Sequence, residues 1–248
     1  MQRYFVKEVI TNEFEIVGED YHHLLHVMRK KIGDQVLVVD GSKKTYYARL
    51  TAIAPEALTF QIVKAKDEDT ELPVAVTLAC GYPKGEKLEW IAQKATEMGM
   101  YQLLGFPASA SVVKWDQNKL QKKAQRLGKI VKEASEQAHR TSIPQVELLR
   151  SFKELVARCS QFTKVLIAYE EAAKIGEESI LSTTLRALQP SESLLVVFGP
   201  EGGLSPQEVL ALTAAGALSC GLGPRILRTE TAPLYLLGCC SYQWELKN

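Results

Sequence analysis

Two glycine-rich breaks, each directly after a short apolar run, constrain this chain more than any other feature. The first run, Leu194–Phe198, ends at Gly199-Pro200-Glu201-Gly202-Gly203, and the second, Ala217–Leu222, ends at Gly223-Pro224. Such apolar runs are typical of strands buried on both faces. Glycine lets bare backbone approach a ligand closely. We therefore expect both loops to line one pocket at the carboxyl ends of their strands.

The residues between the two loops predict a helix. Ser205-Pro206-Gln207-Glu208 is a capping box with proline at the first helical position. Gly216 is placed to close this helix. The succession of strand, loop, helix, strand and loop indicates an α/β fold around the pocket.

Composition excludes several classes of protein. The chain has 248 residues, 46% hydrophobic and 24% charged, which is typical of a globular protein with one large or two modest domains. A net charge of +1 creates no overall field for nucleic acid, so any such binding must come from local patches. Five cysteines without CxxC spacing predict reduced thiols in a cytosolic protein. No signal peptide, membrane span or membrane partner is expected.

The first 70 residues predict a small closed or nearly closed β-barrel. Asp40-Gly41 is a turn signal that joins two strands into a hairpin, and Asp20–Met28 fits a short helix. The charged run Lys66–Pro73 is predicted to be a linker. The expected strands are Arg3–Val9, Glu13–Val17, Gln35–Asp40, Thr45–Ile53 and Ala57–Lys66.

From Val74 onward strand and helix patterns alternate, which predicts an α/β domain with a mostly parallel sheet. Gly99 is placed to close the first helix of this domain. Strands are expected at 74–80, 101–107, 145–148, 164–169, 194–198 and 217–222, and helices at 85–98, 117–139, 151–159, 177–188, 206–215 and 231–245.

Motifs along nearly the whole chain resemble those of one enzyme family. FGPEGGLSPQE at 198–208 and LGPRILRTETA at 222–232 resemble the C-terminal signature of the RsmE-type 16S rRNA (uracil-N3)-methyltransferases, in the SPOUT superfamily. Further segments similar to the family are RYFV, HLLHVMRKKIGDQVLVVDG, EWIAQKATEMGM and IVKEASEQAHRTSIPQV.

The resemblance implies both a fold and an activity. Residues 1–70 would form a PUA-like, RNA-binding β-barrel, and residues 74–248 a SPOUT methyltransferase domain with a C-terminal trefoil knot. The implied enzyme is a cytoplasmic homodimer. It transfers a methyl group from S-adenosylmethionine (S-adenosyl-L-methionine) to N3 of a uridine in 16S rRNA of the small ribosomal subunit.

The two glycine-rich loops are the expected cofactor site. Their spacing alone matches no nucleotide motif, because GxxxxGK[ST] is absent and the third glycine of a dinucleotide fingerprint is missing. With the resemblance, loop backbone groups are expected to pair with the adenine edge, and apolar side chains to pack against its faces. The expected cofactor-binding residues are Phe198, Gly199, Pro200, Glu201, Gly202, Gly203, Leu222, Gly223, Arg225, Ile226 and Leu227.

Uracil N3 carries a proton and is a poor nucleophile until that proton leaves. A base, or a cation that stabilises the resulting charge, would assist the transfer. The candidate catalytic residues are Glu201, Arg228 and Glu230, and solvent is an alternative base. Arg228 also has a simpler interpretation as a surface ion pair with Glu230.

The segment Lys114–Lys132 is the clearest candidate for binding RNA phosphate, because it carries seven cations against one acid, Asp116. A solvated helix face is the commoner explanation of such a pattern. No metal is expected, since His22 and His26 lack further ligands. The candidate RNA-binding residues are Arg3, His26, Arg29, Lys30, Lys114, Lys122, Lys123, Arg126 and Arg140.

One position departs from the family pattern, and two other functions stay open. Ala110 stands where the family is expected to carry arginine, which puts one RNA or active-site contact in question. The alternatives are a SPOUT methyltransferase acting on a ribose 2′-hydroxyl or another base, and a noncatalytic RNA-binding protein. Intact glycines and the unbroken RILRTETA run favour an active enzyme. The helix Thr231–Trp244 is apolar around much of its circumference and is expected to be buried in a core or an interface.

Overall fold

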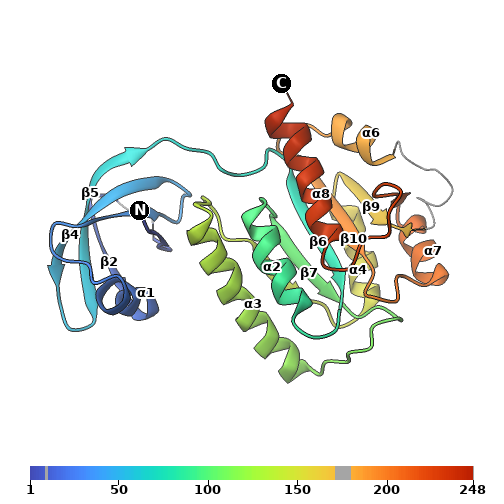
Figure 1. The fold of residues 1–248 in the computed structure, drawn as a ribbon, viewed down its shortest axis with the longest axis horizontal. Coiled ribbons are helices and arrows are strands. Elements are labelled where there is room, and N and C mark those ends of the chain that lie inside the picture. Colours follow the sequence, from blue (N-terminus) through green and yellow to red (C-terminus); the bar gives the residue numbers. More distant parts are fainter. Residues whose placement is uncertain (9–10, 171–179, 248) are drawn as a thin grey trace. The chain divides into compact units, whose positions relative to one another are not determined.

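The computed structural model describes residues 1–8, 11–170 and 180–247, which form two compact units (Figure 1). The N-terminal unit contains residues 1–71 and 135–142, and the C-terminal unit contains residues 72–134 and 143–248. The chain thus returns to the N-terminal unit for eight residues, which include the last three residues of a long helix, Gln117–Gln137.

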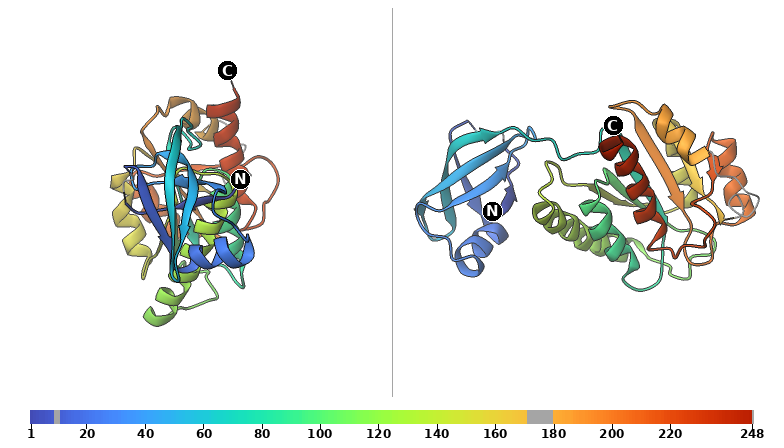
Figure 2. Two further views of the ribbon diagram at one scale, coloured as in Figure 1. Left: turned by 90° about the vertical axis from the view of Figure 1, so that its left-hand side faces the viewer. Right: turned by 45° about the horizontal axis from the view of Figure 1, so that its top comes forward.

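The N-terminal unit is a five-stranded curled sheet in the order β1-β3-β4-β5-β2, coloured blue to cyan in Figure 2. Only the β1–β3 pair is parallel among the described pairs. Alternating residues such as Val36, Val38 and Phe60 form its core. The bounds are β1 Arg3–Phe5, β2 Glu13–Val17, β3 Gln35–Val39, β4 Thr45–Ile53 and β5 Ala57–Lys66.

A short helix covers the end of this unit, as the sequence predicts, but its second half is a π-helix. α1, Gly18–His22, continues into a π-helix, His23–Val27. Leu24 and Tyr21 are buried in the core beneath it. The Tyr4 hydroxyl lies 2.9 Å from Nδ1 of His23, which fixes the π-helical segment to the sheet.

The predicted hairpin between β3 and β4 is present. Gly41 is needed there because it has no side chain, and the left-handed backbone conformation occurs at another residue. The Asp40 carboxylate accepts hydrogen bonds from the amides of Ser42 (2.8 Å) and Lys44 (3.1 Å). The left-handed residue of the turn is Lys43, with φ of 63°. Gly41 is required because a Cβ there would collide with the carbonyl oxygen of Lys7.

The C-terminal unit is built on a six-stranded parallel sheet in the order β11-β9-β10-β6-β7-β8. The strands are β6 Ala75–Gly81, β7 Gln102–Phe106, β8 Gln145–Leu148, β9 Lys164–Ala168, β10 Ser193–Phe198 and β11 Leu218–Cys220. The helices are α2 Lys87–Glu97, α3 Gln117–Gln137, α4 Phe152–Arg158, α6 Ile180–Ala187, α7 Pro206–Ala214 and α8 Ala232–Ser241. A 3₁₀ helix, Cys159–Gln161, follows α4, and a π-helix, Tyr242–Leu246, follows α8.

Helices cover both faces of this sheet. Leu194 and Val196 of β10 belong to one core with residues of α2, α3, α6 and α8. Leu195 and Val197 point the other way, into a second core with residues of α4 and α7. Figure 1 shows α2 and α8 together on one side of the strands. The continuous apolar runs in the sequence reflect this burial on both faces.

Most element bounds agree with the sequence prediction to within two residues. β1 is an exception, because it ends at Phe5 while the prediction extends the strand to Val9. Gly99 and Gly216, with φ of 92° and 93°, close their helices as expected. β11 is shorter than the predicted 217–222, since Gly221 and Leu222 have already left the strand. Residue 9 of the first predicted strand and residues 177–179 of one predicted helix lie outside the described residues.

The structure bears on the expected absence of a membrane span and on the expected state of the cysteines. No helix in the described ranges is long and apolar enough to cross a membrane. All five cysteines are free thiols; Cys239 is half-buried, and Cys80, Cys159, Cys220 and Cys240 are buried.

Candidate functional site

The two glycine-rich loops line one cavity of about 440 Å³ at the carboxyl ends of β9, β10 and β11. The prediction of a single pocket from two separate loops is therefore confirmed. All eleven expected cofactor-binding residues lie in its lining: Phe198, Gly199, Pro200, Glu201, Gly202, Gly203, Leu222, Gly223, Arg225, Ile226 and Leu227.

A third segment lines the cavity and was missed from the sequence. Ala168, Tyr169 and Glu170 follow β9, which lies between β11 and β10 in the sheet. The predicted strand at 164–169 could have indicated that the residues after it line the cavity, because parallel strands bring their carboxyl ends to one edge of the sheet. The other lining residues that the prediction omitted are Leu204, Pro224, Thr229 and Ala232.

The first loop folds tightly on itself, which is why it is glycine-rich. A Cβ on Gly199 would lie 2.8 Å from Cα of Gly203 and 2.9 Å from the nitrogen of Leu204. Gly203 and Gly223 have φ of 71° and 83°, a conformation that L side chains rarely adopt. Glycine at these positions leaves the loop backbone uncovered by side chains, which suits a planar ligand with hydrogen-bonding edges.

The buried carboxylate of Glu208 holds a further segment, Ala108–Ser111, against the Gly199–Gly203 loop. Glu208 completes the predicted capping box with Ser205. It also accepts hydrogen bonds from the amide and the hydroxyl of Ser109, both at 2.8 Å. Burial alone would raise the pKa of Glu208, but the amides of Ser205 and Ser109 lower it below its usual value.

Ala110 lies directly on the Gly199–Gly203 loop as a result. A Cβ on Gly202 would come within 2.8 Å of the Ala110 Cβ, so the two positions are in close contact. Position 110, the departure noted in the sequence, therefore adjoins the cavity wall.

Two of the three candidate catalytic residues share one cation. Lys87 at the start of α2 places Nζ 2.9 Å from Oε1 of Glu201 and 3.4 Å from Oε2 of Glu230. Burial would raise the pKa of Glu201, but Lys87 and the amide of Lys84 lower it overall. A carboxylate held ionised in this way is a weak base.

Arg228, the third candidate, is exposed and does not belong to the cavity lining. Its carbonyl oxygen accepts hydrogen bonds from the amides of Thr231 (2.8 Å) and Ala232 (3.0 Å), where α8 begins. The predicted ion pair between Arg228 and Glu230 is replaced by the pair between Lys87 and Glu230.

The basic segment on α3 is only partly free to bind a ligand. Its buried face carries Leu120, Leu127, Val131 and Ala134. Lys114, Lys119, Lys122, Arg126 and Lys129 are exposed. Glu89 of α2 lies 3.1 Å from Nζ of Lys123 and 2.8 Å from Nε of Arg126, so these two of the predicted RNA-binding residues are ion-paired. The sequence segment Lys114–Lys132 contains only one acid, Asp116, and does not reveal Glu89, because Glu89 belongs to another helix.

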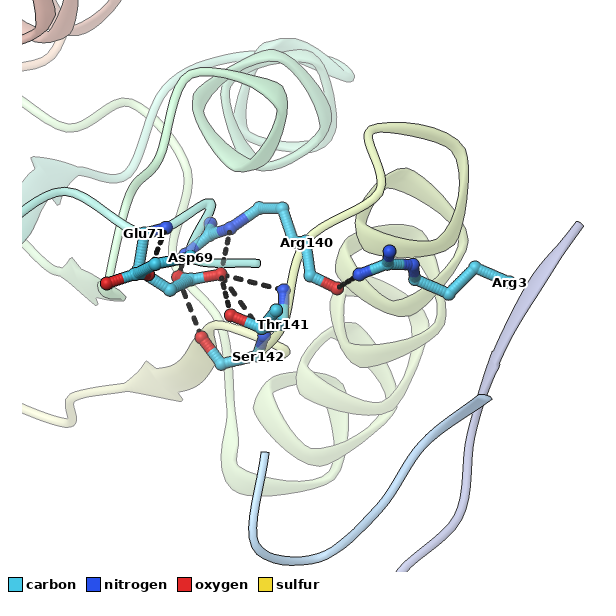
Figure 3. A network of polar contacts seen from close by, with 6 residues as sticks. All are labelled: Arg3, Asp69, Glu71, Arg140, Thr141 and Ser142. Carbon is cyan, nitrogen blue, oxygen red and sulfur yellow. Dashed lines mark hydrogen bonds and ion pairs between the residues drawn. The ribbon is translucent and has the colours of Figure 1, made fainter. Parts of the chain in front are cut away.

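Arg3 and Arg140 were predicted to face RNA, and the structure corrects this. Each residue is only 2% exposed. Arg3 donates to the carbonyl oxygen of Arg140 at 2.8 Å (Figure 3). Arg3 also pairs with Glu68. Arg140 pairs with Glu71. The compensating acids lie in the charged run that was predicted to be a linker.

The other predicted RNA-binding positions of the N-terminal unit remain accessible. His26 and Arg29 are exposed, and Lys30 is half-buried with Nζ 3.5 Å from the carbonyl oxygen of Gln35. His26 stacks on His22, with ring centres 5.6 Å apart. Among the residues that the structure describes, no group of His, Cys, Asp and Glu could hold a metal ion.

Comparisons with known proteins give a consistent result. Residues 70–241 match the RNA methyltransferase domain family, and residues 16–63 match the RNA methyltransferase PUA domain family. A ribosomal RNA small subunit methyltransferase E of Bacillus subtilis is 45% identical over 251 residues, covering 99% of this chain and 98% of that protein. A protein of the same name from Mycobacterium bovis is 32% identical over 225 residues, covering 89% of this chain and 83% of its own length.

A solved structure of this kind has the same architecture. The ribosomal RNA small subunit methyltransferase E from Neisseria gonorrhoeae, bound to S-adenosyl methionine, matches with a TM-score of 0.84 at 27% identity, covering 98% of both chains. The match, together with the two family matches, confirms the predicted fold class of a PUA-like sheet followed by an α/β domain with a parallel sheet.

Proposed function

This chain belongs to the ribosomal RNA small subunit methyltransferase E family, and from that membership we propose that it transfers a methyl group from S-adenosylmethionine to N3 of a uridine in 16S rRNA. The substrate is the rRNA of the small ribosomal subunit. The observation that carries the proposal is the cavity whose lining contains every residue expected from the cofactor motifs.

The cavity fits the cofactor in size and chemistry. A volume of about 440 Å³ lies in the range typical of small-molecule sites, roughly 300–1,000 Å³. The Gly199–Gly203 loop supplies backbone donors and acceptors, while Leu222 and Leu227 supply apolar surface. These residues would hold the cofactor. S-adenosylmethionine supplies a methyl group on a positively charged sulfur, which is already activated for displacement.

The task left to the chain is alignment of the two reactants and removal of the N3 proton. The lowered pKa of Glu201 makes its carboxylate a weak proton acceptor, so we assign it to orientation of the loop. Glu230 lies beside the same cation. Arg228, exposed at the end of the second loop, is suited to bind RNA phosphate or the charge that develops on the base. N3 lies on the Watson–Crick edge, so the target uridine has to be unpaired or flipped.

The RNA surrounding the target requires cationic surface. We assign this role to the exposed residues Lys114, Lys119, Lys122 and Lys129 of the C-terminal unit, and to His26 and Arg29 of the N-terminal unit. In this assignment residues 1–70 are the RNA-binding domain and residues 74–248 the methyltransferase domain. An rRNA substrate also implies a cytoplasmic location.

We further propose a homodimer. The C-terminal helices bury Leu236, Leu237 and Cys240 against the sheet but leave apolar side chains exposed. Tyr242 and Leu246 are 60% and 70% exposed, and Tyr235 is 39% exposed. Large apolar side chains grouped on one helical segment favour contact with a second copy.

The test uses small ribosomal subunits from cells that lack this gene. The subunits are incubated with the protein and labelled S-adenosylmethionine, and the nucleosides are identified by mass spectrometry. We expect 3-methyluridine. A 2′-O-methylated nucleoside would keep the fold and contradict the chemistry. Donor binding without any product would indicate a different RNA substrate or an inactive site, whereas absence of donor binding would favour the noncatalytic alternative. Calorimetric titration with adenosylhomocysteine measures donor binding independently.

A further inference from the structure

We propose that Lys87 is a positioning residue that ties the two cofactor loops together. The inference rests on the proposed function, because it concerns the cavity assigned to S-adenosylmethionine. Lys87 is not in the cavity lining and lies in none of the glycine-rich motifs. Its effect on the cofactor would therefore be exerted through the residues that it holds.

The geometry places one ammonium between the two loops. Glu201 belongs to the Gly199–Gly203 loop, and Glu230 to the loop that follows β11. Nζ of Lys87 lies 2.9 Å from the first carboxylate and 3.4 Å from the second. The Lys87 side chain is 32% exposed, and those of Glu201 and Glu230 are 29% and 21% exposed, so the cluster is partly screened from solvent.

The segment that carries Lys87 is itself packed on the first loop. A Cβ on Gly81, at the end of β6, would lie 2.5 Å from Cδ of Pro200, so the strand end and the loop are in close contact. The amide of Lys84 donates to Oε1 of Glu201 at 3.1 Å. The first loop is thus fixed to the segment between β6 and α2 by the packing of Pro200 on Gly81 and by the Lys84 amide. The second loop is joined to the same point through Lys87.

Loss of the cation would leave two carboxylates close together without a counter-charge. Both contact the same nitrogen, at 2.9 and 3.4 Å, and like charges brought near each other in this way repel more strongly when water is partly excluded. The repulsion would separate the loops and widen the cavity between them. Cofactor affinity is expected to fall, because the loops would have to be brought together during binding.

The test compares Lys87→Met with a matched control. Methionine is an unbranched side chain one atom shorter than lysine and carries no charge. Lys94→Met removes a lysine from the same helix whose side chain and whose partner, Glu97, have the same exposed fractions of 32% and 29%. Calorimetric titration with S-adenosylmethionine and adenosylhomocysteine gives the affinities. Steady-state methylation of small subunits gives kcat and KM for the cofactor.

We expect Lys87→Met to raise the Kd and the KM for S-adenosylmethionine about tenfold, with kcat at saturating cofactor changed less than twofold. Lys87→Arg should keep most of the affinity, and Lys94→Met should bind as the unchanged protein does. The double variant Lys87→Met with Glu230→Gln should recover part of the lost affinity, because the repulsion is gone. A merely structural role would give equal losses of thermal stability in both lysine variants and no rescue.

Two results separate failure of this inference from failure of the proposed function. If the unchanged protein binds neither S-adenosylmethionine nor adenosylhomocysteine, the proposed function is wrong. If the unchanged protein binds both and Lys87→Met binds them equally well, only the role of Lys87 is wrong. The same conclusion would follow if Glu230→Gln gave no recovery in the Lys87→Met background.

Discussion

The carboxylate of Glu71 is the most heavily hydrogen-bonded acid in the described network of the N-terminal unit. It pairs with the side chain of Arg140, and Oε1 accepts from the amide of Thr141 at 2.9 Å while Oε2 accepts from the hydroxyl of Ser142 at 2.8 Å (Figure 3). Burial would raise the pKa of Glu71, but Arg140 and these donors lower it overall. The Arg140 side chain is only 3% exposed, so Glu71 compensates a charge that is largely removed from water.

Glu71→Gln should destabilise the N-terminal unit. Removing one partner of a buried ion pair weakens the compensation of the other charge, and we expect a loss of about 1–3 kcal/mol in the free energy of unfolding. Urea denaturation at pH 7 measures it. Glu147→Gln is the control, since Glu147 and Arg158 pair with side chains 44% and 29% exposed, and such surface pairs contribute about 1 kcal/mol or less. Equal losses in both variants would contradict the structural role given to Glu71.

At the scale of elements, α3 combines a buried apolar face with an exposed cationic one. Leu120, Leu127 and Val131 pack into the core. Lys119, Lys122, Arg126 and Lys129 recur at helical spacing on the exposed side. Glu89 neutralises part of this surface through Lys123 and Arg126. The unpaired part of the stripe is therefore centred on Lys119 and Lys122.

Replacing Lys119 and Lys122 with alanine should weaken RNA binding and make it less salt-dependent. Each lost phosphate contact lowers the slope of log K against log salt by about 0.7–0.9, so the pair should lower it by roughly 1.4–1.8. A filter-binding series with a 16S rRNA fragment measures the slope. The control is the double variant Lys153→Ala with Lys164→Ala, which removes the same charge from exposed positions on α4 and β9. Equal slopes in the two double variants would exclude the stripe as an RNA contact.

At this scale the sequence predicts features that depend on neighbouring residues, and it does not predict contacts between residues far apart in the chain. The capping box at Ser205, the left-handed glycines and the apolar runs are local, and the corresponding helices and strands form where expected. The contact of Lys87 with Glu201 and Glu230 joins segments far apart in the chain, so no local pattern announces it. The burial of Arg3, bonded to a residue 137 positions away, was hidden for the same reason. The residues next to an arginine in the sequence do not indicate whether its side chain is exposed or buried.

At the scale of the whole molecule, ionisable groups with shifted pKa values define the pH range of stability. Burial would raise the pKa values of Glu68, Glu71, Glu89, Glu201 and Glu208, but cationic side chains and amide donors lower each below its ordinary 4.5. Burial, and then the charge of Arg3, lowers the pKa of His139 below 6.5. On the alkaline side, burial raises the pKa of the Cys80 thiol from 9.0 to about 12.

The free energy of unfolding should therefore be highest between about pH 6.5 and pH 9. Below 6.5 the unfolded chain takes up a proton at His139 more readily than the folded one, and below about 4.5 it does so at the five carboxylates, so stability falls as the pH falls. Above 9 the unfolded chain loses the Cys80 proton that the folded chain retains, so stability falls again as the pH rises. Urea midpoints from pH 3.5 to 10.5 test both sides, and Glu71→Gln should have a shallower acid limb because one of the five carboxylates is gone. A midpoint that stays constant from pH 7 to 4 would contradict the pairing of these carboxylates, since ion pairs that stabilise the fold must be lost when their acids are protonated.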